Sequence, residues 1–104
     1  MTILEIREKI FEEKYLIKSH ALTHALKEGF DRKNIIEAVS EGKIIENYEF
    51  ENRLPVCGQA KLTDNVTVYL HIVCEYSDDI FVEIVTAYIP DESLWTNPPF
   101  KRRK

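Results

Sequence analysis

His71 lies in the middle of a stretch whose spacing predicts a β-strand with one polar face. Between residues 66 and 76, aliphatic side chains alternate with polar and aromatic ones, so His71 and Tyr69 point away from the core side. A histidine beside tyrosine hydroxyls suits acid–base chemistry on a phosphodiester. The alternative is a half-exposed sheet face whose polar side chains only pair across strands.

Further reactive side chains are expected next to this strand if its neighbours pair with it antiparallel. Turns at 63–65 and 78–79 would give each residue of the central strand a partner on either side. The expected pairs are Cys57 with His71, His71 with Thr86, Gln59 with Tyr69, and Tyr69 with Tyr88. A cysteine beside a histidine suggests nucleophilic chemistry, although most free cysteines are small buried hydrophobes.

A second set of polar side chains shares one face of a helix predicted from Ser19 onward. His20, His24 and Lys27 are spaced i, i+4 and i+7. Two imidazoles one turn apart can bind a metal ion, but a complete site needs another ligand, and the sequence identifies none. We therefore expect no metal and no cofactor, and a solvated polar face. A metal-dependent hydrolase built on His20 and His24 is the alternative.

Three helices are expected to precede the sheet. Thr2 and Glu5 fit a capping box, which predicts a first helix over residues 3–13. Residues 15–18 are rich in β-forming side chains and separate it from the second helix, whose apolar face is expected to be Leu22, Ala25 and Leu26. The remaining boundaries are N-caps at Ser19 and Asp31 and terminal glycines at Gly29 and Gly42.

After Gly42 the apolar spacing changes to the period of two that is typical of strands. Strands are expected at 44–50, 56–62, 66–76 and 80–89. The short turns between them favour antiparallel pairing. The sequence therefore predicts a single α+β domain over residues 1–104, with about three helices on one face of a meander of about four strands.

Charge is distributed unevenly along the chain. The formal net charge is −4, from 14 basic and 18 acidic residues, and four of the basic ones form a tail over residues 101–104. An acidic body repels a polyphosphate, because lysine and arginine supply most non-specific affinity for nucleic acids. The tail either contacts RNA or an acidic partner, or is a solvated terminus. Just before it, Trp95 is expected to clasp the C-terminal segment against Tyr88 and Pro90.

Cysteine usage and hydropathy indicate the compartment. The two cysteines, Cys57 and Cys74, have no CxxC spacing, so a four-cysteine zinc site or a thioredoxin-like motif is excluded. Neither a signal peptide nor an apolar run of about 18 residues is visible. We therefore expect a cytoplasmic protein with reduced thiols and no membrane contact.

Five motifs resemble those of a family of small prokaryotic domains of unknown function. In chain order they are SHALTHALKEGF, IIEAVSEGKIIENYE, PVCG, LHIV and TAYIPDESLW, and the resemblance covers residues 17–104. By its arrangement this family is similar to RelE/ParE-type and BrnT-type toxins of toxin–antitoxin pairs. The resemblance implies helices followed by an antiparallel sheet, cleavage of mRNA either free or on the ribosome, and a protein antitoxin as partner. The residues that match the family motifs are His20, Cys57, His71, Thr86 and Tyr88.

Two functions therefore compete. In a toxin-like ribonuclease the 2′-hydroxyl of the RNA attacks, so a base, a charge stabiliser and an acid are needed. The catalytic candidates are His71 as acid or base, Tyr88 and Thr86 beside it, and His20 as a positioning group. The binding candidates are Tyr69, Cys57, Arg53, His24 and Lys27, with the basic tail as a second phosphate contact. The alternative is a non-catalytic module that docks a protein partner, which the acidic balance favours.

The location of the second helix decides whether His20 and His71 share a site. If that helix packs over the polar sheet face, both imidazoles can converge on one cleft. If it covers the opposite, aliphatic face, they lie on opposite sides of the sheet.

Overall fold

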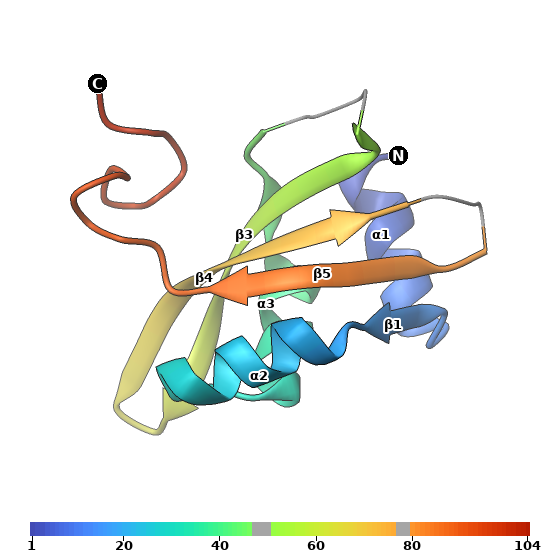
Figure 1. The fold of residues 1–104 in the computed structure, drawn as a ribbon, viewed down its shortest axis with the longest axis horizontal. Coiled ribbons are helices and arrows are strands. Elements are labelled where there is room, and N and C mark those ends of the chain that lie inside the picture. The colour runs from blue at the N-terminus through green and yellow to red at the C-terminus, as the bar shows by residue number, and fades with distance from the viewer. Residues whose placement is uncertain (47–50, 77–79) are drawn as a thin grey trace.

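The computed structural model describes residues 1–46, 51–76 and 80–104. These residues form the predicted α+β architecture, with three helices and a five-stranded sheet among them (Figure 1). The elements are α1 (Ile3–Phe11), β1 (Tyr15–Ile17), α2 (Ser19–Glu28), α3 (Arg32–Glu41), β2 (Lys43–Ile44), β3 (Arg53–Thr63), β4 (Val66–Glu75) and β5 (Val82–Tyr88). Most of the strand expected over 44–50, and the turn expected at 78–79, lie outside the described residues.

Local capping explains where the helices begin and end. Thr2 and Glu5 form the expected capping box at α1, and Asp31 with Asn34 forms another at α3. Gly29 ends α2 in the left-handed region, at φ 92°. One boundary differs: Ser19 is already helical and Lys18 is the N-cap, without a side-chain hydrogen bond.

The sheet contains one strand more than expected. Its order is β1-β5-β4-β3-β2, and only β1 pairs parallel with its neighbour. The extra strand is the segment at residues 15–17, which the sequence indicated only as a break between helices. Its partner β5 is more than 60 residues away in the chain, so no local signal predicts the pairing. Lys14 O accepts from Val82 N at 3.1 Å, and Lys18 N donates to Ile84 O at 2.9 Å.

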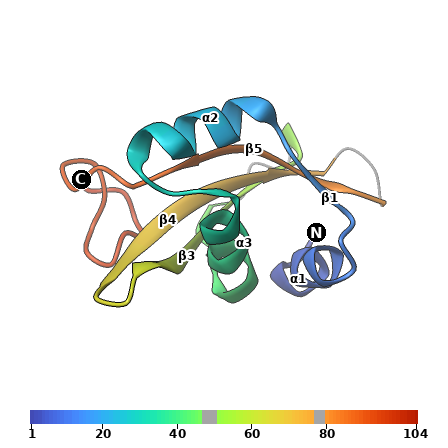
Figure 2. The same cartoon turned by 90° about the horizontal axis from the view of Figure 1, so that it is seen from below.

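Residues of all three helices share one core with the aliphatic residues of β3, β4 and β5; in Figure 2, α1 and α3 lie together on one side of the strands, and α2 lies along β5. Ala21 and Ala25 of α2 are fully buried there, whereas Leu26, expected to face inward, is 66% exposed. On β4 the expected core face is buried at Leu70, Ile72 and Cys74, but Val66 at the strand's start is exposed. Ala21 and Ala25, one turn apart, define the inward side of α2, and Leu26 lies about 100° further round the helix, so it points outside.

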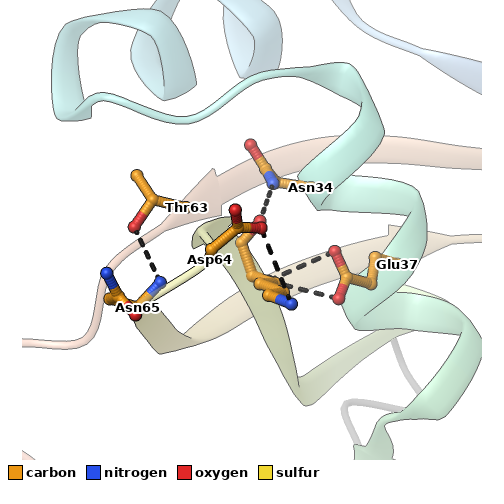
Figure 3. A network of polar contacts seen from close by, with 6 residues as sticks. Asn34, Glu37, Thr63, Asp64 and Asn65 are labelled. Atoms are coloured by element: carbon orange, nitrogen blue, oxygen red, sulfur yellow. Dashed lines mark hydrogen bonds and ion pairs between the residues drawn. The ribbon is translucent and has the colours of Figure 1, made fainter.

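Polar contacts fasten α3 to the hairpin of β3 and β4 (Figure 3). Asn34 Nδ2 donates to Lys61 O at 3.3 Å, and the Glu37 carboxylate accepts from Lys61 N at 3.2 Å. At the turn, Asn65 N donates to the Thr63 hydroxyl at 3.3 Å. These hydrogen bonds fix the distance between α3 and the C-terminal end of β3.

The C-terminal segment, residues 93–104, packs on the sheet face that carries His71, opposite the face on which α3 lies against Gly58. Trp95 is buried there, so it holds the segment to the body as expected. The basic tail is not frayed: Arg102 pairs with Glu46 at 3.0 Å, and its guanidinium lies 4.6 Å from the Trp95 ring centroid. Arg103 N donates to Leu94 O at 2.8 Å, so the segment folds back on itself.

Candidate functional site

His71 is fully buried, and both of its ring nitrogens have protein partners. Nε2 lies 2.7 Å from the carbonyl oxygen of Pro99, and Nδ1 lies 3.2 Å from the hydroxyl of Tyr88. The Trp95 ring packs edge-on against the imidazole, with centroids 4.4 Å apart. The residue expected to be an acid or base on an open sheet face is therefore enclosed by the C-terminal segment.

The register between β3 and β4 agrees with the prediction. Cys57 lies opposite His71, and Gln59 lies opposite Tyr69. The turn is one residue shorter than expected, because Thr63 pairs with Val66. A bulge between Lys61 and Thr63 absorbs the difference and restores the predicted pairs further along.

The register between β4 and β5 was predicted wrongly by two residues. His71 lies opposite Tyr88, not Thr86, and Thr86 lies opposite Val73. The connection between the strands is longer than a two-residue turn, and an irregularity between Val73 and Cys74 adds a second one-residue shift. A shift of two keeps every side chain on its predicted face. Tyr88 and Thr86 thus stay on the polar face, each opposite a residue two positions further along β4 than predicted.

Burial changes the acid–base properties of His71 and Cys57. Burial lowers the pKa of His71 below its ordinary value, against the opposing effects of the Pro99 hydrogen bond and the nearby Glu46 charge. The pKa of the Cys57 thiol is raised to about 11, mainly by burial and despite the nearby Lys43. A thiol with such a pKa is protonated at neutral pH and is a poor nucleophile.

The polar residues of α2 are not among the contacts of His71. His20 and Lys27 are exposed, and His24 Nε2 lies 3.2 Å from the Glu28 carboxylate. The second Glu28 oxygen accepts from Ile89 N at 2.7 Å, which ties α2 to the end of β5. Because the buried residues of α2, Ala21 and Ala25, belong to the same core as the aliphatic face of the sheet, His20 and His71 do not converge on one cleft.

Arg53 is engaged at the far end of β3. Its Nε lies 3.0 Å from Glu75 Oε2 across the β3–β4 pair. The described residues contain no group of three or more His, Cys, Asp or Glu side chains arranged to hold a metal ion. Nor does the described part of the chain contain a helix both long and apolar enough to cross a membrane.

An open pocket beside Tyr69 gathers polar side chains that can reach solvent. We call it the Tyr69 groove; it has a volume of about 250 Å³. The side chains that give it its chemistry are Arg7, Glu41, Lys43, Gln59, Tyr69 and Phe100. They come from α1, α3, β2, β3, β4 and the C-terminal segment.

Two cations in the Tyr69 groove lack a carboxylate partner within the described residues. The Lys43 ammonium lies 3.8 Å from the Phe100 ring centroid. The Arg7 guanidinium donates to Gly42 O at 2.6 Å, and its Nε is buried without a hydrogen bond. Glu41 lies in the same groove, where one carboxylate oxygen accepts from Gln59 N at 2.9 Å. The arrangement can hold a phosphate beside a base and a phenol.

Of the groove residues, the sequence pointed to Tyr69 and Cys57 as candidates and placed Gln59 beside Tyr69. Lys43 could have been found. If the strand expected from residue 44 is extended back by one residue, Lys43 becomes part of it and pairs with Cys57. Arg7 reaches the groove from α1 through its contact with Gly42, 35 residues away in the chain, and no local pattern marks it.

The sequence profile of one family matches the chain. The family is described as a domain of unknown function, DUF4258, and the match covers residues 17–89, more than half of the chain. No curated protein and no solved structure matched. The match thus confirms the resemblance to a domain family of unknown function, whereas the likeness to RelE-type toxins stays a prediction. The comparisons give neither a reaction nor a ligand.

Proposed function

The chain belongs to the DUF4258 family, and we propose that it is a toxin-like ribonuclease that cleaves single-stranded RNA in the Tyr69 groove. The observation that carries this proposal is the meeting of two cations, a carboxylate and a phenol in one open pocket. Lys43 and Arg7 supply positive charge for binding a phosphate, although the chain as a whole is acidic. Phosphoryl chemistry depends mainly on such fixed charge.

The groove residues divide into the roles that 2′-hydroxyl attack requires. Glu41 accepts the proton of the 2′-hydroxyl, whose oxygen bonds to phosphorus. Lys43 and Arg7 neutralise the non-bridging oxygens as charge develops. Tyr69 donates its proton to the 5′-oxygen as the P–O5′ bond breaks. The products are a 2′,3′-cyclic phosphate and a 5′-hydroxyl, and proton exchange with water restores Glu41 and Tyr69.

His71 has a different role in this proposal from the one that its strand position suggested. With both ring nitrogens engaged inside the protein, it does not contact the RNA. It holds Pro99, which immediately precedes the groove residue Phe100. We therefore assign it as a positioning residue, together with Tyr88.

Cleavage of a labelled single-stranded RNA by the purified protein tests the proposal. Lys43→Ala and Tyr69→Phe are expected to lower the rate by about 100-fold or more, the usual contribution of a positioned acid or charge. Lys27→Ala removes an exposed lysine on α2 and is the matched control, expected to cleave normally. The products should carry cyclic phosphate and 5′-hydroxyl ends.

A growth assay extends the test to RNA on the ribosome. Induction in a bacterial host is expected to arrest growth, and Lys43→Ala at equal expression is expected to relieve the arrest. Absence of cleavage of free RNA together with unimpaired growth would overturn the proposal. So would equal rates for the wild type and both groove variants.

A non-catalytic role as a protein-binding module is the second candidate, and the open edge of β1 favours it. In the parallel pair with β5, residue 16 bonds to β5, so the backbone groups of Tyr15 and Ile17 point outward. Within the described residues these outward groups have no protein partner. Leu16 is 53% exposed on the same strand. An added strand from a partner such as an antitoxin would satisfy these groups.

Charge at this edge selects the partner strand. A second copy pairing antiparallel about Leu16 would put Lys14 opposite Lys18, which is unfavourable. Lys14 and Lys18 already contact Glu12 and Glu83, at 3.4 and 3.3 Å, and an extended segment with acidic residues at these positions would bring a second carboxylate to each lysine. A peptide of alternating valine and glutamate should therefore shift the amide resonances of Tyr15 and Ile17, and a peptide of alternating valine and lysine should not. Equal shifts with both peptides, or none, would contradict this second candidate.

A further inference from the structure

A second pocket adjoins the Tyr69 groove and shares Tyr69 with it. This Trp95 pocket has a volume of about 210 Å³, and the residues that decide its chemistry are Val68, Tyr69, Ile89, Glu92, Trp95 and Asn97. The C-terminal segment supplies Trp95 and Asn97, and Glu92 immediately precedes that segment. The pocket exists because His71 and Trp95 hold the segment against the sheet.

From this arrangement we propose that the Trp95 pocket binds an adenine base of the RNA whose phosphate lies at Lys43. The inference rests on the function proposed above and specifies its substrate. Because Tyr69 lines both pockets, one nucleotide can occupy them together, with the base on one side and the phosphate on the other.

The size and the walls of the pocket suit a single base. Its volume is below the roughly 300–1,000 Å³ of pockets for drug-sized ligands. Val68, Ile89 and the largely buried Trp95 provide an apolar surface, and Tyr69 provides an aromatic one. Proteins that bind single-stranded RNA stack unpaired bases on such side chains.

The polar rim distinguishes a base from a phosphate. Glu92 is acidic, so it disfavours a phosphate here and directs it toward Lys43 and Arg7. The side chains of Glu92 and Asn97 are exposed and make no hydrogen bond with any described residue. A carboxylate only accepts hydrogen bonds, which favours a base with an exocyclic amine. Asn97 can pair with adenine N6 and N7 through both atoms of its amide.

Trp95 is the only tryptophan, so its fluorescence reports directly on this pocket. Adenosine is expected to change the emission of the intact protein, and uridine is expected to bind at least about fivefold more weakly, since it cannot offer an amine to Glu92. Adenosine 5′-monophosphate should bind about tenfold more tightly than adenosine, because its phosphate reaches Lys43. Lys43→Ala should remove that tenfold advantage and leave adenosine binding unchanged.

Asn97→Ala tests the rim, and Asn65→Ala is its control, an exposed asparagine outside the pocket. Adenosine is expected to bind at least about fivefold more weakly to Asn97→Ala and normally to Asn65→Ala. Both variants should keep the native circular dichroism spectrum, since neither side chain is buried.

The outcomes separate this inference from the proposed ribonuclease function. Adenosine binding without RNA cleavage would support the pocket and overturn the reaction. RNA cleavage with no effect of adenosine on Trp95, or equal binding of adenosine and uridine, would overturn the inference alone. Equal binding by Asn97→Ala and the wild type would also overturn it.

Discussion

The Nε2 atom of His71 lies 2.7 Å from the carbonyl oxygen of Pro99, which joins the middle of β4 to the C-terminal segment. A carbonyl only accepts, so Nε2 carries the proton and donates it. Nδ1 of this neutral imidazole then accepts from the Tyr88 hydroxyl at 3.2 Å. The pair is satisfied internally, and it holds the chain that forms the walls of both pockets.

His71→Ala is expected to destabilise the fold by about 3 kcal/mol. The loss combines two hydrogen bonds of about 1 kcal/mol each with the cavity left beneath Trp95. Urea unfolding followed by circular dichroism measures it, with Trp95 fluorescence as a probe of the C-terminal segment. His20→Ala, at an exposed position on α2, should change the unfolding free energy by less than about 0.5 kcal/mol. Similar values for the two variants would contradict the role assigned to His71.

The depressed pKa of His71 predicts that stability falls on acidification. The folded protein holds this imidazole neutral, because burial lowers its pKa below the ordinary 6.5. Below pH 6.5 the unfolded chain binds a proton that the folded chain does not, so the free energy of unfolding rises with pH in this range. The part of the unfolding free energy that neutral His71 contributes at pH 7 is lost as the pH falls from 6.5 toward the pKa of His71 in the folded protein.

His71→Gln isolates this contribution, since glutamine keeps a hydrogen-bonding side chain without titrating. Between pH 7 and pH 5 the wild type is expected to lose more unfolding free energy than His71→Gln, as measured by urea unfolding at each pH. Parallel pH profiles would show that other groups carry the acid sensitivity.

The helices could be predicted from the sequence because their signals are local. The capping box at Thr2, the N-cap at Asp31 and the glycine at Gly29 each act within one turn of the boundary that they set. The register of β3 and β4 was also predictable, because a short turn links adjacent strands. There the errors in turn and bulge cancel, so that Cys57 faces His71 as expected.

The candidate site was less predictable because it depends on contacts between distant segments. The alternation of side chains along β4 places His71 on the polar face of the sheet, where a residue is expected to be exposed. It is buried because residues 93–104 fold back over this face. Arg7 and Lys43 meet Tyr69 only after α1, β2 and β4 have packed. The β4–β5 register failed because a long connection and a bulge shift in the same direction.

Gly58→Ala is expected to be among the most damaging single changes in the sheet. A Cβ atom at this position would lie 1.9 Å from the backbone oxygen of Ala38, so α3 would have to move away from β3. Overpacking against backbone typically costs 1–3 kcal/mol or more, and we expect about 3 kcal/mol here. Loss of unfolding free energy in urea is the measurement.

Gly29→Ala is the comparison for this change, since nothing lies within 4 Å of the added Cβ. Its cost is only the left-handed backbone at φ 92°, about 1–2 kcal/mol. A smaller effect at Gly58 than at Gly29 would show that α3 is free to shift over β3.

The thiols are expected to resist alkylation while the protein is folded. With a pKa of about 11, Cys57 is a thiolate in only about one molecule in a thousand at pH 8. Cys74 is less reactive still, because burial raises its pKa to about 12. A chromogenic disulfide reagent should therefore react slowly with the native protein and rapidly with two thiols per chain in urea.

The order of reaction separates the two thiols and tests Cys57 as a nucleophile. Cys57 lines the Tyr69 groove, whereas Cys74 lies in the core, so Cys57→Ser should abolish most of the slow native reaction. Cys74→Ser should leave it nearly unchanged. Native reaction at the rate of a free cysteine would mean that Cys57 forms a thiolate readily, and nucleophilic catalysis would then have to be reconsidered. The slow reaction that we expect follows from desolvation of the thiolate, which the charge of the nearby Lys43 only partly offsets.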